Sequence, residues 1–77
     1  MLPNFYVYSV TPLKSSLLVA TSYGPLFLDD DDFDRFAVRP EWLIQNIDTP
    51  EAYKLLSVIK IYYMHLAQEL YKRGELS

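Results

Sequence analysis

The sequence contains no cysteine, only two glycines and a single histidine among its 77 residues. Without cysteine the chain forms no disulfide and no thiolate zinc site, and one histidine is too few for a histidine-rich metal site. Two glycines are also too few for a glycine-rich phosphate loop or a dinucleotide-binding fingerprint. No serine lies in the G-x-S-x-G context of a hydrolase nucleophile. We therefore predict a protein that is not an enzyme and that uses neither a cofactor nor a metal.

Charged side chains are few and unevenly placed. Seven Lys and Arg residues stand against ten Asp and Glu residues, which gives a formal net charge of -3. Because phosphate binding depends mainly on clustered basic side chains, this balance predicts no direct contact with nucleic acid. The apolar stretch over residues 17–28 is interrupted by polar residues and is shorter than the about 20 residues that span a bilayer. No basic residue precedes Lys14, so no secretory signal is predicted, and we expect a cytoplasmic protein without a membrane partner.

The length of the chain predicts a single domain over residues 1–77. A chain of this size buries only roughly 60–65% of its unfolded surface, so its core is marginal unless something completes it. Apolar residues make up 51% of the sequence, which excludes a disordered chain. Association with itself or with a partner is the common remedy that remains. We expect a β-rich half over residues 1–28, an acidic junction over 29–34 and a helical half over 35–77.

The first half has the composition of a small sheet. Residues 5–10 are aromatic and β-branched, as strands favour, and Thr11 and Pro12 are expected to end this strand. Residues 17–21 predict a second strand. A turn signal over 23–25 precedes a short third strand over 26–28. The connections are too short for parallel crossovers, so the pattern predicts an antiparallel meander.

The second half has the signals of helices. Asp32 is expected to cap a short turn over residues 33–36, and Pro40 suits the first position of a helix that runs to Asn46. The strongest signal lies over residues 50–73, where a capping residue and a proline precede a long periodic pattern and a glycine follows it. The predicted fold is therefore α+β: a small two- or three-stranded antiparallel β-meander followed by a short helix and a long C-terminal amphipathic helix.

The long helix carries more apolar residues than a small sheet needs to cover it. A spacing of about 100° per residue places one broad apolar stripe on the helix. A further apolar set lies beside or behind that stripe, and the helix around Trp42 is one candidate to cover it. The other interpretation is an interface with a second copy, as in a dimer, or with a partner protein. The residues of this interface are Tyr53, Ile61, Met64 and Tyr71.

Five of the ten acidic residues form one run, at Asp29, Asp30, Asp31, Asp32 and Asp34. Part of this run matches the spacing of a calcium loop, but Arg35 stands where the loop needs glycine and the preceding segment is a predicted strand. A solvated loop that caps the following turn is the simplest interpretation. An acidic patch that docks on a basic partner is the functional one.

Other residues with functional potential are aromatic. Tyr6 and Tyr8 alternate with Phe5 and Val7 along the first strand, so they lie on one face of it, and both faces are apolar. Trp42 is either a core anchor or a binding hot spot. His65 is expected on the polar face of the long helix, paired with Glu69.

These features favour a protein-interaction module, a small acidic binder that modulates a larger protein by occupying its surface. The predicted contacts are the five aspartates together with Tyr6, Tyr8 and Trp42, and the partner is expected to have a basic surface. Inhibitors, immunity proteins, antitoxins and anti-defence proteins of phages or mobile elements are of this size and charge. Two alternatives stay open: a structural or assembly subunit that acts through its own homo-oligomer, and a calcium- or ligand-binding domain.

Overall fold

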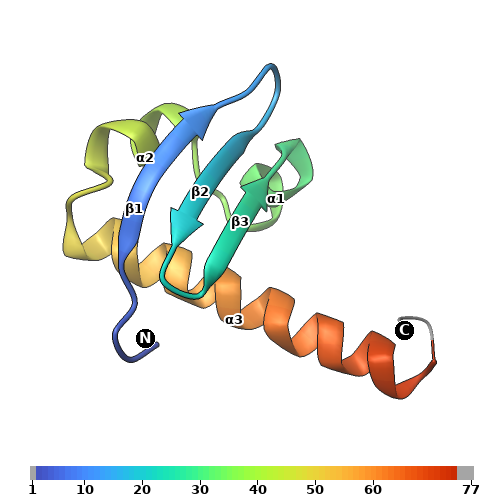
Figure 1. The fold of residues 1–77 in the computed structure, drawn as a ribbon. Helices are drawn as coiled ribbons and strands as arrows, with labels where there is room; N and C mark the ends of the chain where they lie inside the picture. The colour runs from blue at the N-terminus through green and yellow to red at the C-terminus, as the bar shows by residue number, and fades with distance from the viewer. Residues whose placement is uncertain (1, 75–77) are drawn as a thin grey trace.

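The computed structural model describes residues 2–74 and shows an antiparallel three-stranded sheet followed by three helices (Figure 1). The strands are β1 (Val7–Pro12), β2 (Leu17–Thr21) and β3 (Gly24–Leu28), and they lie side by side in sequence order. The helices are α1 (Asp30–Arg35), α2 (Pro40–Asn46) and α3 (Pro50–Lys72). They lie on one side of the sheet and leave its other face open (Figure 1). The predicted α+β fold is confirmed.

The strand register divides the sheet into a buried and an open face. Leu17 pairs with Leu28 and Val19 with Leu26, and all four side chains are buried. Between these pairs, Leu18 faces Phe27 on the open side, where both are exposed. Successive side chains of a strand alternate between faces, so the apolar composition of β2 supplies both surfaces.

The first and third strands differ from their predicted bounds. β1 runs from Val7 to Pro12 instead of residues 5–10, with an irregularity between Val7 and Ser9. Pro12 is tolerated because β1 is an edge strand and Pro12 is its last residue. β3 begins at Gly24, whose φ of 101° lies in the left-handed region that glycine enters without strain. Pro25 follows in the same strand, again at an edge of the sheet.

The acidic junction is a helix in the structure, which corrects the prediction of a loop that caps a later turn. The cap is Asp29, whose side chain accepts a hydrogen bond from the backbone N–H of Asp32, and the Asp32 side chain accepts one from the backbone N–H of Asp29. This reciprocal pair satisfies two donors that the helix cannot satisfy itself. Carboxylates in the first turn also interact favourably with the positive end of the helix dipole. Four consecutive aspartates therefore suit a helix start, although aspartate is a poor former of helix interiors.

The two later helices agree closely with their predicted bounds. Pro40 occupies the first turn of α2, and α3 begins at Pro50 after Thr49, whose side chain accepts a hydrogen bond from the N–H of Ala52. α3 ends at Lys72, with Arg73 as its C-cap. Within the described residues, neither α3 nor any other helix has the length and apolar content to cross a membrane.

The core lies between the buried face of the sheet and the first half of α3. Ala52, Leu56 and Ile59 of α3 have no exposed surface, and Leu43 of α2 is buried beside them. Phe5 closes one end of the core, where its ring packs against Tyr23 and Tyr53. The remaining buried apolar residues are Leu17, Val19, Leu26, Leu28 and Phe33.

Candidate protein-interaction surface

The structure separates the predicted contact residues into two groups. Tyr6 and Tyr8 are exposed at the β1 edge of the sheet. Trp42 lies on α2, among the helices, and the aspartate run lies on α1. The helical side therefore combines Trp42 with the acidic residues, whereas the two tyrosines belong to another part of the surface.

The five aspartates have different roles. Asp29 caps α1, and Asp32 is buried. The Tyr63 hydroxyl donates a hydrogen bond to the Asp32 carboxylate, and the Arg35 guanidinium lies 3.4 Å from the same carboxylate. We therefore assign Asp29 and Asp32 to the stability of the fold.

The three other aspartates form a surface of free carboxylates. Asp30, Asp31 and Asp34 are exposed, and their side chains take part in no hydrogen bond or ion pair with residues 2–74. We call these three residues the acidic face of α1. Asp30 and Asp34 are four residues apart and lie on one side of the helix, with Asp31 beside Asp30. No group of three or more acidic or histidine side chains in the described part of the chain is arranged to hold a metal ion.

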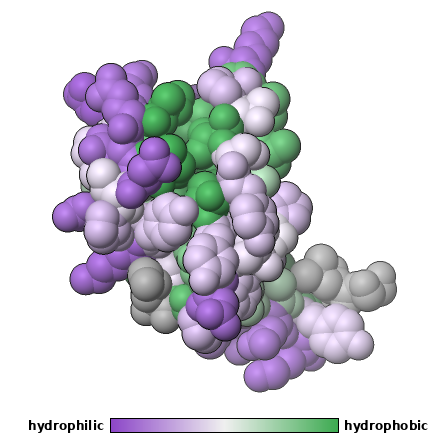
Figure 2. All heavy atoms as spheres, turned by 60° about the vertical axis from the view of Figure 1, so that its left-hand side comes forward, coloured by the Kyte–Doolittle hydropathy of each residue, from purple (hydrophilic) through white to green (hydrophobic). Residues whose placement is uncertain are grey.

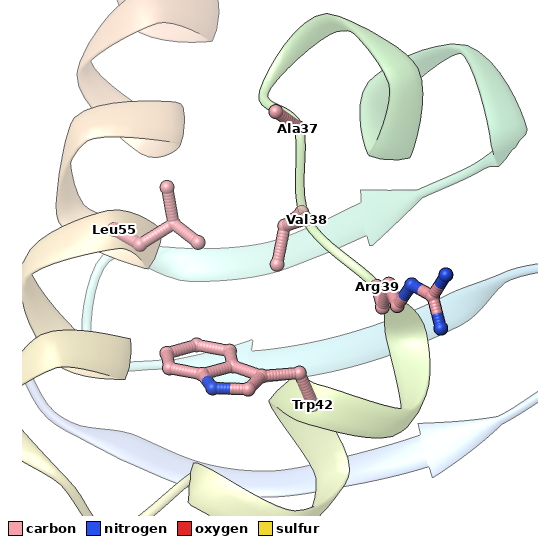
Figure 3. A pocket seen from close by; sticks show the side chains of 5 residues that line it. All are labelled: Ala37, Val38, Arg39, Trp42 and Leu55. Carbon is pink, nitrogen blue, oxygen red and sulfur yellow. The ribbon is translucent and has the colours of Figure 1, made fainter.

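A pocket lies where the chain leaves the C-terminal end of α1. It has a volume of about 390 Å³ and is open to solvent, and we call it the Trp42 pocket (Figure 3). The Trp42 indole extends along it toward Leu55 of α3, and the Arg39 guanidinium points away from it (Figure 3). Trp42 remains 37% exposed, so it is not the fully buried core anchor that a lone tryptophan on an amphipathic helix usually is. The lining residues are Ala37, Val38, Arg39, Trp42 and Leu55.

The turn at the C-terminal end of α1 forms one wall of the pocket. The N–H of Val38 donates to the carbonyl of Phe33, and the N–H of Ala37 donates to the carbonyl of Asp34. This pair of bonds is the Schellman motif, whose penultimate residue adopts a left-handed conformation and is usually glycine. Here it is Ala37, with a φ of 51°. The motif turns the chain abruptly and places Val38 over Trp42, as Figure 3 shows. Sequence reasoning missed it because its usual signal, a glycine, is absent.

Aromatic side chains continue this surface from α1 onto α3. The ring of Phe36 packs edge-on against Tyr62 at 5.5 Å between centroids, and the Arg35 guanidinium lies 5.6 Å from the centre of the Tyr62 ring. Val58, Tyr62 and Leu66 are all exposed along the same flank of α3. The pocket is therefore one end of an apolar strip that borders the C-terminal end of α1.

A second apolar area lies between α2 and the β1–β2 connection. Leu13 and Ile44 are exposed there and border a recess of about 220 Å³ that also contacts Asp30. Figure 2 turns the α2 side of the molecule forward and shows hydrophobic surface gathered in its upper part, with hydrophilic residues around it. Exposed apolar surface of this kind is typical of protein-interaction sites.

The structure separates Tyr53 from the three other residues predicted to form an oligomer interface. Tyr53 packs on the core of its own chain, and its hydroxyl donates to the carbonyl of Val7 at 3.4 Å. Ile61 and Met64 line a recess on α3, and Tyr71, seven residues after Met64 on the same helix face, is exposed. His65 is exposed on α3 as expected, but Glu69 lies 4.0 Å from Lys72, and no ion pair joins it to His65 within the described residues.

The hydroxyl of Tyr63 provides a test of the contact between α1 and α3. Its burial, together with its hydrogen bond to the Asp32 carboxylate, raises the pKa of Tyr63 from 10.0 to about 12. The folded state therefore favours the protonated phenol. The stability that the protonated Tyr63 hydroxyl adds is fully present below the pKa of 10.0 of an unfolded tyrosine. It is lost as the pH rises through the folded-state pKa of about 12.

We expect one tyrosine to titrate near pH 12 in the folded protein, and the Tyr63→Phe variant to lack this transition. We also expect wild-type stability to fall more steeply than that of Tyr63→Phe above about pH 10. Ultraviolet titration of the tyrosines measures the first effect, and urea unfolding at several alkaline pH values measures the second. A late transition that persists in Tyr63→Phe would assign it to another tyrosine and contradict the contact.

In comparisons with known proteins, no family model, no curated sequence and no solved structure matches this chain.

Proposed function

We propose that this chain is a non-enzymatic protein-interaction module that binds a larger protein through its helical side. The Trp42 pocket receives an apolar side chain of the partner, and the acidic face of α1 meets basic residues around it. The observation that carries the proposal is the position of a partly exposed tryptophan in an open apolar pocket, one short loop along the chain from three carboxylates that have no partner within residues 2–74.

The two parts of this surface supply different contributions to binding. Aromatic residues in pockets are common binding hot spots, because their large apolar area is removed from water at little cost in conformational entropy. The volume of about 390 Å³ lies in the range of sites that hold a small ligand or an anchoring side chain. The exposed aspartates act at longer range, where complementary charge accelerates encounter more than it strengthens the final complex.

The surface also indicates the class of partner. A protein that fits presents an apolar anchor within a basic surface. Proteins that bind nucleic acid present basic surfaces of this kind, and the aspartates of α1 would take the place of phosphates there. Occupying such a surface blocks it, which is how small acidic inhibitors, immunity proteins, antitoxins and anti-defence proteins act. We place this chain in that functional class.

The Trp42→Ala variant tests the pocket. We expect the partner captured from the native host by the wild-type chain to be lost with Trp42→Ala and retained with Tyr8→Ala. Tyr8 is the matched control because it is an exposed aromatic residue at the β1 edge. The purified partner is then titrated against each variant, with an expected loss of about 2 kcal/mol of binding free energy for Trp42→Ala, or about 30-fold in affinity. Circular dichroism shows whether each variant is folded.

The chain's single tryptophan makes the same site observable without a label. Emission from Trp42 should shift to shorter wavelength when the partner covers the indole. Neutralising Asp30, Asp31 and Asp34 to asparagine should slow association and remove its dependence on salt, with little effect on dissociation. Binding that is lost with Tyr8→Ala and kept with Trp42→Ala would instead place the interface at the sheet edge and overturn the proposal.

A further inference from the structure

The second half of α3 extends beyond the rest of the molecule. Figure 1 shows α3 continuing well past the sheet toward the C-terminus. From Met64 to Gly74 every residue is exposed apart from Leu70, which is half-buried. We call residues 64–72 the α3 overhang. Its nine residues add about 13 Å of helix, which receives little of the tertiary packing that normally stabilises helices in proteins.

The overhang continues the apolar pattern of the packed half of the helix. Leu56 and Ile59 are completely buried, and the same spacing of three and four residues continues through Tyr63 to the overhang. In the overhang it reaches Leu66 and Leu70. This is the a and d pattern of a helix that packs along another helix. One apolar face is therefore covered by the sheet over its first half and faces water over its second half.

The pattern defines how two overhangs fit together. In an antiparallel pair, an a position of one helix faces a d position of the other. Leu66 then packs against Leu70 of the second copy, and the symmetry repeats this contact. Ala67 lies next to the symmetry axis, where its small side chain allows the helices to approach closely.

The same register brings together opposite charges. It places Arg73, the next position of the pattern, opposite Tyr63 of the other copy. Tyr63 contacts α1, because its hydroxyl donates to the Asp32 carboxylate and accepts from the Arg35 guanidinium at 3.3 Å. The segment over residues 29–35 carries five carboxylates against this one guanidinium, so it stays strongly acidic. The basic end of each α3, Lys72 and Arg73, therefore meets the most acidic segment of the other chain. Charge complementarity thus selects a second copy as the molecule that covers the overhang.

We propose that the chain forms a symmetric dimer through the antiparallel pairing of its α3 overhangs. Leu66 and Leu70 form the apolar seam, and the last turn of each helix docks on α1 of the other copy. This interface leaves the Trp42 pocket free, because the pocket lies at the other half of α3, beside Leu55. The dimer contact shares the short helix α1 with the surface proposed above to bind a partner, but its test, the mass of the full chain in solution, does not depend on that function.

Sedimentation equilibrium of the full chain tests the dimer. We expect twice the mass of one chain for the wild type and a dissociation constant at least about tenfold higher for the double variant Leu66→Asn, Leu70→Asn. Met64→Asn is the matched control, because Met64 and Leu66 are equally exposed, at 40% and 39%, on different faces of the same turn. Circular dichroism shows whether α3 stays helical in each variant.

Two charge substitutions test the dimer by the same measurement even if the asparagines reduce the helicity of α3. Ala67→Glu places two like charges at the symmetry axis and should weaken the dimer, whereas Gln68→Glu, on the neighbouring face, should not. Arg73→Glu should weaken it and reduce its sensitivity to salt, whereas Lys54→Glu makes the same charge change in the packed half of α3 and should have little effect. A wild type that stays monomeric at high concentration would overturn the proposal. So would a dimer that is broken by Met64→Asn but not by Ala67→Glu.

Discussion

The Leu56→Ala variant is expected to lose about 2–5 kcal/mol of its free energy of unfolding. Leu56 has no exposed surface, and its position on α3 places it against the buried face of the sheet. Truncation removes three buried carbons and leaves a cavity that a small, closely packed core closes only in part. Small domains are stable by only about 5 kcal/mol or somewhat more, so a loss at the upper end of this range would leave a large fraction of the variant unfolded at ambient temperature.

Urea unfolding followed by circular dichroism measures this loss, and Val58→Ala is the control. Val58 lies two residues away on α3 and is 46% exposed, so its truncation should change stability by less than about 1 kcal/mol. If the two variants lost equal stability, α3 would not present Leu56 to the sheet as described. If dimerisation through the overhang contributes to stability, the measurements must be made at one protein concentration.

The second large effect is expected for Asp32→Ala, at about 3 kcal/mol. The substitution removes half of the reciprocal cap of α1, which contributes about 1 kcal/mol. It also removes the carboxylate that accepts the hydrogen bond from the Tyr63 hydroxyl. A hydrogen bond to a charged group contributes about 1.5–3 kcal/mol to stability. The cap bond orients the start of α1. The hydrogen bond from the Tyr63 hydroxyl ties α1 to α3.

Asp31→Ala is the matched control for this prediction. Asp31 is the preceding residue of the same helix, and it is exposed without a partner inside the described structure. Its removal should leave stability within about 0.5 kcal/mol of wild type and should even relieve repulsion among the aspartates. Equal effects of the two substitutions in urea unfolding would mean that the run acts through its total charge and that Asp32 has no special role.

The sequence predicted the fold well where local signals agreed with one another. α3 has a cap, a proline in its first turn, a long apolar period and a glycine past its end, and its observed bounds differ from the prediction by one residue. The strands were placed less accurately. Phe5 has strand composition, but it packs into the core before β1 begins, and no local signal distinguishes a buried aromatic residue from the start of a strand.

The candidate surface was predicted only in part, because composition does not distinguish the roles of identical residues. Four neighbouring aspartates look alike in the sequence. Only the helical geometry of α1 turns Asp32 toward Tyr63 and leaves Asp31 in solvent. The Trp42 pocket depends on Leu55 and on the turn at Ala37, which are brought beside Trp42 by tertiary packing and by a left-handed alanine. Neither contact has a signal in the sequence.

The sequence indicated that the long helix carries more apolar residues than the sheet covers, but it did not indicate where on the helix the uncovered residues lie. The prediction placed the surplus beside or behind the main stripe. The structure shows that the main stripe itself becomes uncovered toward the C-terminus, since Leu66 is exposed. The reason is that α3 is longer than the strands that cover it. A strand of five residues spans about 17 Å, whereas a helix of 23 residues spans about 34 Å.

The prolines at the two edges of the sheet have a consequence for aggregation. A sheet with free edges and no charged residue in its strands would offer its backbone groups to strands of other molecules. β1 contains Pro12 and an irregularity next to Val7, and β3 contains Pro25. Each proline lacks the N–H that an added strand requires. The protein can therefore keep an uncharged sheet without joining others into fibres, and association is directed to its side-chain surfaces.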